Sequence, residues 1–398
     1  MELLAVAKPG YTSLSPDRST VASFDREGRL YAYFKAGITF RRSLASAVEA
    51  RWKPGPQDEQ DRLTQDAQDG SGGTPMERGQ RQRRRLSPSE AGELFREVYA
   101  MAAACVPHAQ GEVRERLEQE ILRWTPDSLL GEAERFARVY KPISILPPDH
   151  YLSIVLQATE GCTWNRCTFC SFYQDRPFRA KSTDEFAEHV AAVRRFLGRG
   201  VLMRKGVFLA DGNALALSHA RLEPMFRLVR QAFPGHRIYS FVDLYTGERR
   251  PVDEWRHLVQ LGLHRVYIGM ETGLDELLKF LNKPGSQEEL SAFVADLKQA
   301  GAAVGLIVMV GVGGVQYREA HARATLAAVA RMPLGREDLV YLSPFIEHPG
   351  SVYAARRQEA GLTPLTPAET ETELRRLATS LRAGGVRAAR YDIREFIY

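Results

Sequence analysis

Cysteine is scarce in this chain, since only 4 of its 398 residues are Cys. So few cysteines cannot form the dense disulfide framework of a small secreted domain. Long apolar runs are also missing, because no uninterrupted stretch approaches the ~20 residues that a membrane-spanning helix needs. The opening segment MELLAVAKPGYTS has no basic stretch followed by a long apolar run and a cleavage site. We therefore expect a protein of the reducing cytoplasm without a membrane segment.

The composition itself is that of a large globular protein. Hydrophobic residues make up 44% of the chain and charged residues 26%, which is typical of soluble domains. The net charge of +5 comes from arginines spread along the chain, with one dense cluster at Arg81, Arg83, Arg84 and Arg85. This cluster is compatible with RNA or another anion as a partner. A solvated polybasic loop is the simpler interpretation.

The first 150 residues divide into three regions. In residues 1–53, the stretch FDREGRLYAYFKAG places a turn at residues 25–28 between two strand-like runs, which predicts a small β-rich unit. Residues 54–86 contain almost no large apolar side chains and predict a flexible polar linker. Residues 87–150 are expected to be helical, and their first helix should begin at Ser87, with Glu90 completing a capping box. Cys105 ends that helix and is expected to be a buried structural thiol.

From about residue 151 onward, short apolar runs alternate with segments of helical period. Runs of this kind, rich in Val, Ile, Leu and Tyr, are typical of buried strands. They are LSIVLQAT (152–159), GVFLA (206–210), RIYSFV (237–242), RVYIGM (265–270), VGLIVMV (304–310) and LVYLS (339–343). The alternation predicts right-handed crossovers and a parallel sheet, either curled into part of a barrel or lying open.

Polar residues follow most of these predicted strands. In either arrangement, ligands bind at the carboxyl ends of parallel strands, so these residues should share one rim. In chain order they are the loop EGCTWNRCTFC (160–170), Asp211 to Asn213, Asp243, Glu271 with Thr272, and GVGG (311–314). The GVGG run lacks the spacing of a phosphate-binding loop and predicts a tight turn. His321 lies alone in the region that follows and is expected to have a structural role.

The loop EGCTWNRCTFC holds three of the four cysteines. Three thiolates in one loop are ligands for zinc or for an iron–sulfur cluster. Structural zinc needs four ligands, and no Cys or His lies at the usual spacing of a second pair. A four-iron cluster held by three cysteines instead keeps one iron open, where a substrate or cofactor can coordinate.

These features resemble the radical S-adenosylmethionine (radical SAM) superfamily. The resemblance covers about residues 150–398 and includes FLADGNAL, YIGMETGLDELLKFLNKPGS, VGLIVMVGVGG and YLSPFIEHPGSVY. It implies an α/β fold, a partial (β/α)6 TIM-type barrel over residues 151–398, with the helices of residues 87–150 packing on the barrel. The cysteine spacing is CX4CX2C, whereas the familiar spacing has three residues and then two. The longer form recurs in one branch that is known mostly by its domain.

The resemblance also implies which residues bind the cofactors. Cys162, Cys167 and Cys170 would hold three irons of a [4Fe–4S] cluster, and S-adenosylmethionine (SAM) would chelate the fourth. Further contacts to SAM would come from Phe169 on the adenine, from Asp211, Gly212 and Asn213 on the methionine ammonium, and from Ser240, Glu271 and Thr272 on the ribose and carboxylate. No catalytic residue beyond these follows from the resemblance.

The implied function is reductive cleavage of SAM to a 5′-deoxyadenosyl radical that abstracts hydrogen from an unidentified substrate. The electron would come from an external donor of the flavodoxin or ferredoxin type. Two alternatives stay open at this point. One is a non-catalytic protein that binds an iron–sulfur cluster, a metal or a tetrapyrrole, and the other is a radical SAM enzyme that modifies RNA through the arginine cluster.

Overall fold

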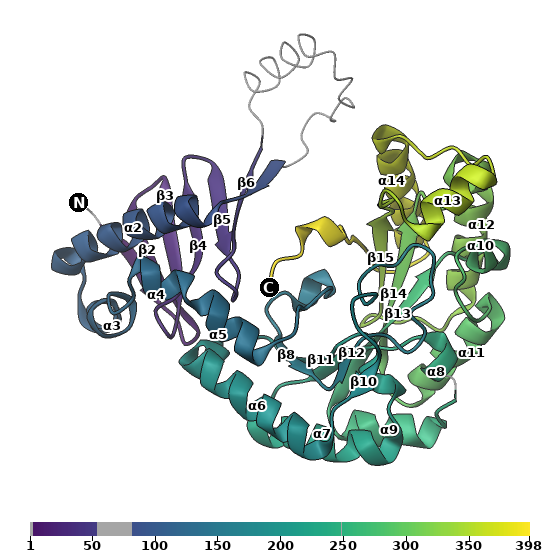
Figure 1. Ribbon diagram of the computed structural model, residues 1–398, viewed down its shortest axis with the longest axis horizontal. Coiled ribbons are helices and arrows are strands. Elements are labelled where there is room, and N and C mark those ends of the chain that lie inside the picture. The colour runs from purple at the N-terminus through teal and green to yellow at the C-terminus, as the bar shows by residue number, and fades with distance from the viewer. Residues whose placement is uncertain (1–2, 54–81, 248) are drawn as a thin grey trace, which may run out of the picture. The chain divides into compact units, whose positions relative to one another are not determined.

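The computed structural model describes residues 3–53, 82–247 and 249–398 (Figure 1). The chain divides into two compact units. The first comprises residues 1–142, 192–204 and 397–398, and the second comprises residues 143–191 and 205–396. Most of the range predicted as a linker, residues 54–81, lies outside the described residues. No helix in the described part of the chain has the length and apolar character that a membrane span requires.

The first unit contains a seven-stranded antiparallel sheet whose strands follow one another in chain order. The strands are β1 (Leu4–Ala7), β2 (Tyr11–Asp17), β3 (Thr20–Asp25), β4 (Leu30–Lys35), β5 (Ile38–Arg42), β6 (Val48–Trp52) and β7 (Gln82–Arg85). Strand β7 falls in the range predicted as a linker, yet it pairs with β6 and sets Arg83 opposite Arg51. As an edge strand, β7 forms backbone hydrogen bonds with one neighbour only. Its polar side chains therefore do not prevent it from pairing with β6.

Helices accompany this sheet in the first unit. They are α2 (Pro88–Cys105), α3 (Gly111–Arg116), α4 (Pro126–Leu130) and α5 (Glu132–Val139), with the short turns η1 (Val106–His108) and η2 (Leu117–Ile121). Ser87 caps α2 and Glu90 completes the capping box, as predicted. Within the first unit, the apolar face of α2 packs against the N-terminal sheet. Packing of residues 87–150 on the barrel stays a prediction. Cys105 is fully buried in that cluster, among Phe95, Val98 and Leu117.

The second unit contains a seven-stranded parallel sheet in the order β16-β15-β14-β13-β12-β11-β8. The strands are β8 (Ile154–Gln157), β11 (Val207–Ala210), β12 (Ile238–Phe241), β13 (Leu263–Glu271), β14 (Ala303–Val310), β15 (Leu339–Pro344) and β16 (Ala388–Arg390). All six predicted strands are present, and β16 extends the sheet beyond them. Because β8 and β16 stand at its two edges, the sheet of the described residues is open.

Helices connect successive strands of this sheet. They are α6 (Thr183–Leu197), α7 (His219–Ala232), α8 (Leu244–Gly247), α9 (Val252–Gln260), α10 (Asp275–Phe280), α11 (Gln287–Gln299), α12 (Gly314–Arg331), α13 (Val352–Glu359) and α14 (Pro367–Ala383), with short turns η3 (Pro148–His150), η4 (Gly198–Met203), η5 (Ala214–Ala216) and η6 (Ile393–Glu395). Figure 1 shows α7, α9, α11 and α12 along the outer side of the curved sheet. The predicted fold class, a partial (β/α)6 barrel with a β-rich N-terminal unit, is confirmed.

Candidate cofactor site

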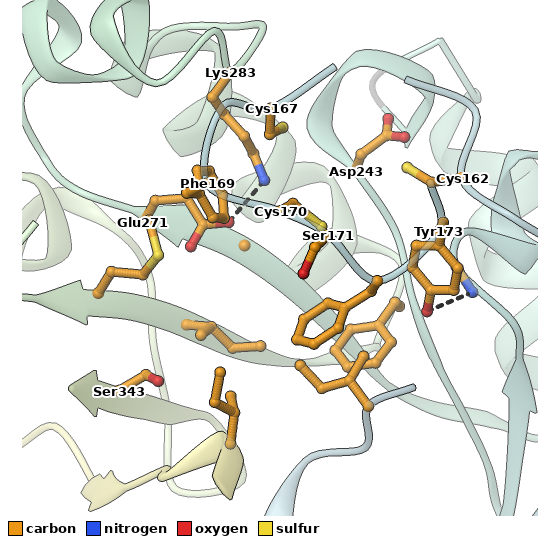
Figure 2. Close-up of a pocket in the computed structure, with 18 of the residues that line it drawn as sticks. Cys162, Cys167, Phe169, Cys170, Ser171, Tyr173, Asp243, Glu271, Lys283 and Ser343 are labelled. Atoms are coloured by element: carbon orange, nitrogen blue, oxygen red, sulfur yellow. Dashed lines mark hydrogen bonds and ion pairs between the residues drawn. The ribbon is translucent and has the colours of Figure 1, made fainter. Parts of the chain in front are cut away.

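A pocket lies at the carboxyl ends of the parallel strands, where the sequence placed the polar rim. Its cavity volume is about 220 Å³. Figure 2 shows Cys162, Cys167 and Cys170 in its wall, together with Phe169 and Glu271. Gly212 and Asn213 line it as well, whereas Asp211, Ser240 and Thr272 are not among the lining residues.

The cysteine loop is closed at its base by a short antiparallel pair of strands. Strand β9 (Thr159–Glu160) pairs with β10 (Arg179–Ala180), so residues 161–178 form one loop above the sheet. Gly212, in the turn after β11, has a φ of +58°, and a Cβ there would lie 1.9 Å from the carbonyl oxygen of Gly161. Only glycine permits so close an approach between the two backbones. The turn after β11 therefore fixes the start of the cysteine loop.

All four residues between Cys162 and Cys167 are anchored by hydrogen bonds. The Thr163 hydroxyl donates to Asp243 at 2.9 Å, and the Trp164 indole donates to the carbonyl of Asn282 at 2.8 Å. The Asn165 amide donates to the carbonyl of Tyr173 at 2.8 Å. The carbonyl of Arg166 accepts a bond of 2.8 Å from the Asn282 amide. The four-residue spacer is thus a docked segment.

The three cysteines of the loop are free thiols. Burial raises the pKa of Cys167 to about 12 and also raises the pKa of Cys170, while the nearby Lys283 ammonium acts in the opposite direction on both. A buried thiol of this kind carries little charge by itself. Binding of a metal would convert these thiols to thiolates and release their protons.

Lys283 forms a buried ion pair with Glu271 in the pocket wall. Its Nζ lies 2.8 Å from Glu271 Oε1, and only 15% and 9% of the two side chains are exposed (Figure 2). Burial acts to lower the pKa of Lys283, but Glu271 and the adjacent Cys167 raise it above its ordinary value. The lysine therefore places a fixed positive charge beside the cysteine loop.

Asp211 is buried behind the pocket wall. One of its carboxylate oxygens accepts a bond of 2.9 Å from the Tyr173 hydroxyl, which in turn accepts a bond of 3.1 Å from the Gly212 amide. The other oxygen, Oδ2, has no hydrogen-bond partner among the described residues, although Arg176 Nη1 lies 3.7 Å away. Burial raises the pKa of Asp211 to about 6, against the lowering effects of Tyr173 and Gly212.

Asn213 belongs to a polar network that joins the turns after β11 and β12. Its amide nitrogen donates to Asp243, to the Thr163 hydroxyl at 3.0 Å and to the Thr246 hydroxyl at 2.9 Å. Asp243 also accepts bonds of 2.7 Å from the amide and the hydroxyl of Thr246. The network ties the cysteine loop to two neighbouring strand ends.

Ser240 and Thr272 lie behind the wall with their hydroxyl groups engaged. Ser240 is fully buried, and its hydroxyl donates to the carbonyl of Leu209 at 2.7 Å. The hydroxyl of Thr272 lies 2.8 Å from His321 Nδ1 and accepts a bond from the amide of Leu274. Burial lowers the pKa of His321 to about 4, so it is neutral near pH 7. Contact of either hydroxyl with a cofactor stays a prediction.

The pocket wall contributed by the C-terminal part of the barrel is largely apolar. After β15 it includes Phe345 and Ile346, and after β16 it includes Tyr391 and Ile393. Ser343 and His348 are the polar side chains on this wall. Tyr391 and Ile393 belong to the terminal stretch YDIREFIY (391–398).

Sequence reasoning missed several residues of the site. Lys283 and Asn282 occur in the stretch FLNKPGS, which was noted only as part of the resemblance, and Tyr173 lies three residues after Cys170. Asn282 and Lys283 stand just before a Pro-Gly turn, about one helix after the predicted site residue Glu271. That position was the available signal for both residues. Nothing local signals that Tyr173 turns back toward Asp211, because that contact joins residues 38 positions apart.

The family model for the radical SAM superfamily matches residues 156–326, a range that contains all three loop cysteines, Asn213 and the Glu271–Lys283 pair. None of the curated proteins compared with the chain matches it.

Several solved structures are similar to the chain at low identity. Coproporphyrinogen III oxidase (HemN) from Escherichia coli shows 17% identity and a TM-score of 0.44, covering 64% of this chain and 56% of its own. The cobalamin-dependent SAM radical enzyme OxsB shows 15% identity and a TM-score of 0.38, covering 60% of this chain and 31% of its own. Methylornithine synthase (PylB) shows 15% identity and a TM-score of 0.42, covering 75% of this chain and 85% of its own. The chain thus spans 56% of the HemN chain and 31% of the OxsB chain.

Fold and pocket together define an α/β protein with a three-cysteine site at the carboxyl edge of a partial barrel. Residues 156–326 match the family model of the radical SAM superfamily, so the chain carries a radical SAM domain over this range.

Proposed function

We propose that this protein binds a [4Fe–4S] cluster through Cys162, Cys167 and Cys170 and uses it to cleave SAM reductively. One observation carries the proposal: three free thiols of a chain with four cysteines line one pocket at the carboxyl edge of a parallel sheet, inside a radical SAM domain. When bound, the cluster supplies one electron that breaks a carbon–sulfur bond of SAM, and the resulting 5′-deoxyadenosyl radical abstracts hydrogen from the substrate.

The residues present fit these cofactors. The three loop thiols provide soft ligands for three irons and leave the fourth iron open. A cluster with three thiolates is anionic, and the buried Lys283 ammonium beside Cys167 offsets part of that charge. At the second strand end, where the resemblance puts the methionine ammonium of SAM, Gly212 and Asn213 line the pocket and Asp211 lies behind them.

The remaining residues position and enclose the cofactor in this proposal. Gly212 and Asn213 present backbone and amide groups to the methionine end of SAM. Phe169 offers an aromatic face to the adenine. Glu271 is held by Lys283 and presents its carboxylate to the ribose. Asp211, Ser240 and Thr272 lie behind the wall, where their hydrogen bonds hold the strand ends that carry these contacts.

The substrate is proposed to enter from the apolar wall formed by Phe345, Ile346 and Ile393. Apolar side chains there would exclude water from the reacting centre. An external one-electron donor of the flavodoxin or ferredoxin type would reduce the cluster. The substrate itself has no assignment.

The test is anaerobic reconstitution of the full chain with iron and sulfide, followed by reduction with dithionite in the presence of SAM. We expect about four irons per chain and the release of 5′-deoxyadenosine and methionine, measured by chromatography. Cys162→Ala, Cys167→Ala and Cys170→Ala should each lose the cluster and reduce both products to the background without protein. Cys105→Ala is the matched control, because that thiol is buried in the N-terminal unit and should leave iron content unchanged.

Two outcomes would contradict the proposal. If iron content is the same in the three loop variants as in the Cys105 variant, these thiols do not hold the cluster. If the fully loaded protein releases neither product, the non-catalytic iron–sulfur alternative replaces the enzymatic one.

A further inference from the structure

A second group of metal-binding side chains lies away from the pocket, between helices α7 and α9. His219 is the first residue of α7, Glu223 follows four residues later on the same helix, and His257 comes from α9. One ligand atom from each lies within 4.8 Å of the other two. Residues spaced by four share one face of a helix, so His219 and Glu223 both face α9.

The contacts of His219 favour a bound cation. Its Nε2 lies 2.8 Å from His257 Nδ1 and 3.9 Å from Glu223 Oε2. Its other nitrogen, Nδ1, is buried and has no hydrogen-bond partner among the described residues. That nitrogen lies 3.9 Å from Glu254 Oε2. Two imidazoles in contact can share only one proton between the facing nitrogens, whereas a metal ion accepts a lone pair from each.

The surrounding charges complete this arrangement. Arg227 binds the Oε1 oxygen of Glu223 at 2.7 Å, which leaves Oε2 toward the histidines, and the hydrogen bond to Arg227 lowers the pKa of Glu223. Arg250 holds Glu254 at 3.0 Å. With Nε2 on a metal, His219 would turn its Nδ1–H toward Glu254, as in the carboxylate–histidine–metal pattern that orients metal ligands in other proteins.

We propose that His219, Glu223 and His257 form a second metal site, which takes a divalent ion of the zinc class. Two imidazoles and one carboxylate suit zinc, whereas magnesium and calcium prefer oxygen ligands only. The side chains of His219 and Glu223 are 20% and 32% exposed, so water can reach the site and occupy the remaining coordination position. This site is independent of the proposed cluster chemistry.

The site has a structural consequence for the pocket. Arg250, which holds Glu254, also donates to the carbonyls of Leu215 and Leu217 in the segment that follows Asn213. An ion at His219 would cross-link α7 to α9 next to that segment. We infer that zinc stabilises the strand ends that carry Asn213 and Asp243.

The test is zinc binding by the full chain with its cluster reconstituted, measured by competition with a chromophoric chelator and by metal analysis. We expect one zinc per chain, with affinity at least ~10-fold weaker in His219→Ala, His257→Ala and Glu223→Gln. His236→Ala is the control, because this half-buried histidine contacts only its own turn among the interactions of the described residues. Zinc should also raise the melting temperature of the wild type and of His236→Ala, and not that of the three site variants.

A chain with all three loop cysteines replaced by serine separates this site from the cluster. Zinc retained in that variant and lost in His219→Ala supports the proposal. Zinc lost with the cysteines and retained in His219→Ala overturns it, and so does equal binding by His219→Ala and His236→Ala. If the histidine variants fail to fold, Glu223→Gln decides, since it leaves the His219–His257 contact in place and removes only the anionic ligand.

Discussion

The two ends of the parallel sheet use polar residues in opposite ways. At the amino end, Asp149 accepts hydrogen bonds from the hydroxyls of Tyr267 at 2.6 Å and Tyr341 at 2.7 Å, and from Arg265 at 2.9 Å. His150 lies 2.7 Å from the Tyr267 hydroxyl through Nε2 and 2.7 Å from the Ser153 hydroxyl through Nδ1. Each of these groups has a partner within the network.

At the carboxyl end, polar groups line an open pocket instead. Cys162, Cys167 and Cys170 form no disulfide and line that pocket, and behind its wall Oδ2 of the buried Asp211 has no hydrogen-bond partner among the described residues. An unpaired buried polar group is costly. The amino end is organised for stability, whereas the carboxyl end presents thiols that a ligand can bind.

The largest effect on stability is expected for the ion pair of Lys283 with Glu271 at the carboxyl end. Lys283→Met removes the ammonium and leaves Glu271 buried without its partner, which should lower the free energy of unfolding by about 3–5 kcal/mol. Chemical denaturation of the cluster-free protein measures the change. Lys279→Met is the matched control, because Lys279 is exposed on the preceding helix α10. A double variant with Glu271→Gln should recover part of the loss, and simple additivity would show that the two side chains are not coupled.

Asp149→Ala tests the amino end of the comparison. It leaves the Tyr267 and Tyr341 hydroxyls and Arg265 without their shared acceptor, and should cost about 3 kcal/mol of unfolding free energy. Iron content and SAM cleavage per folded chain should stay at the wild-type level. Asp175→Ala, at an exposed aspartate of the cysteine loop, is expected to change stability little. If folded Asp149→Ala protein cleaves less SAM than the wild type, the amino end also contributes to activity, and the division of roles between the two ends is wrong.

Asp211→Asn tests the cost of an incompletely paired carboxylate. Burial raises the pKa of Asp211 from 3.8 to about 6, so folding favours the neutral carboxyl over the carboxylate relative to the unfolded chain. The stability that this preference contributes is complete below pH 3.8 and is lost as the pH rises through about 6. Asparagine stays neutral, so the variant should gain up to about 3 kcal/mol over the wild type above that pH and nothing below pH 4.

Urea denaturation of both proteins at about pH 4 and about pH 8 measures this difference. Asp175→Asn is the control, since the pKa of that exposed carboxyl is lowered by its bond to Arg176. A stability difference that does not depend on pH would mean that Asp211 is not the titrating group. A gain in stability together with weaker SAM binding would fit a carboxylate kept for its ligand.

The positions of the strands, and with them the two ends of the parallel sheet, follow from the sequence. The contacts that distinguish the two ends do not. Apolar runs and helical periods predict all six strands and thus the edge at which the cysteines and Glu271 meet. The pairing of Lys283 with Glu271 bridges only 12 residues, and the polar pair before Pro-Gly marks its position without showing that the lysine turns inward. Two of the four bonds that dock the spacer join residues more than 100 positions apart and depend on tertiary packing.

The spacer between Cys162 and Cys167 offers the smallest and most specific test of the carboxyl end. Asn282 has a φ of +53° and donates from its side chain to the carbonyl of Arg166. Asn282→Gly keeps this backbone conformation and loses the bond, at a cost of about 1 kcal/mol, whereas Asn282→Ala adds the strain of a Cβ and should cost about 2 kcal/mol. If docking of the spacer positions the cysteines, both variants should change the electron paramagnetic resonance spectrum of the reduced cluster similarly, despite their different stabilities. A spectral change that follows stability alone would show that the spacer bond supports the fold and not the cluster.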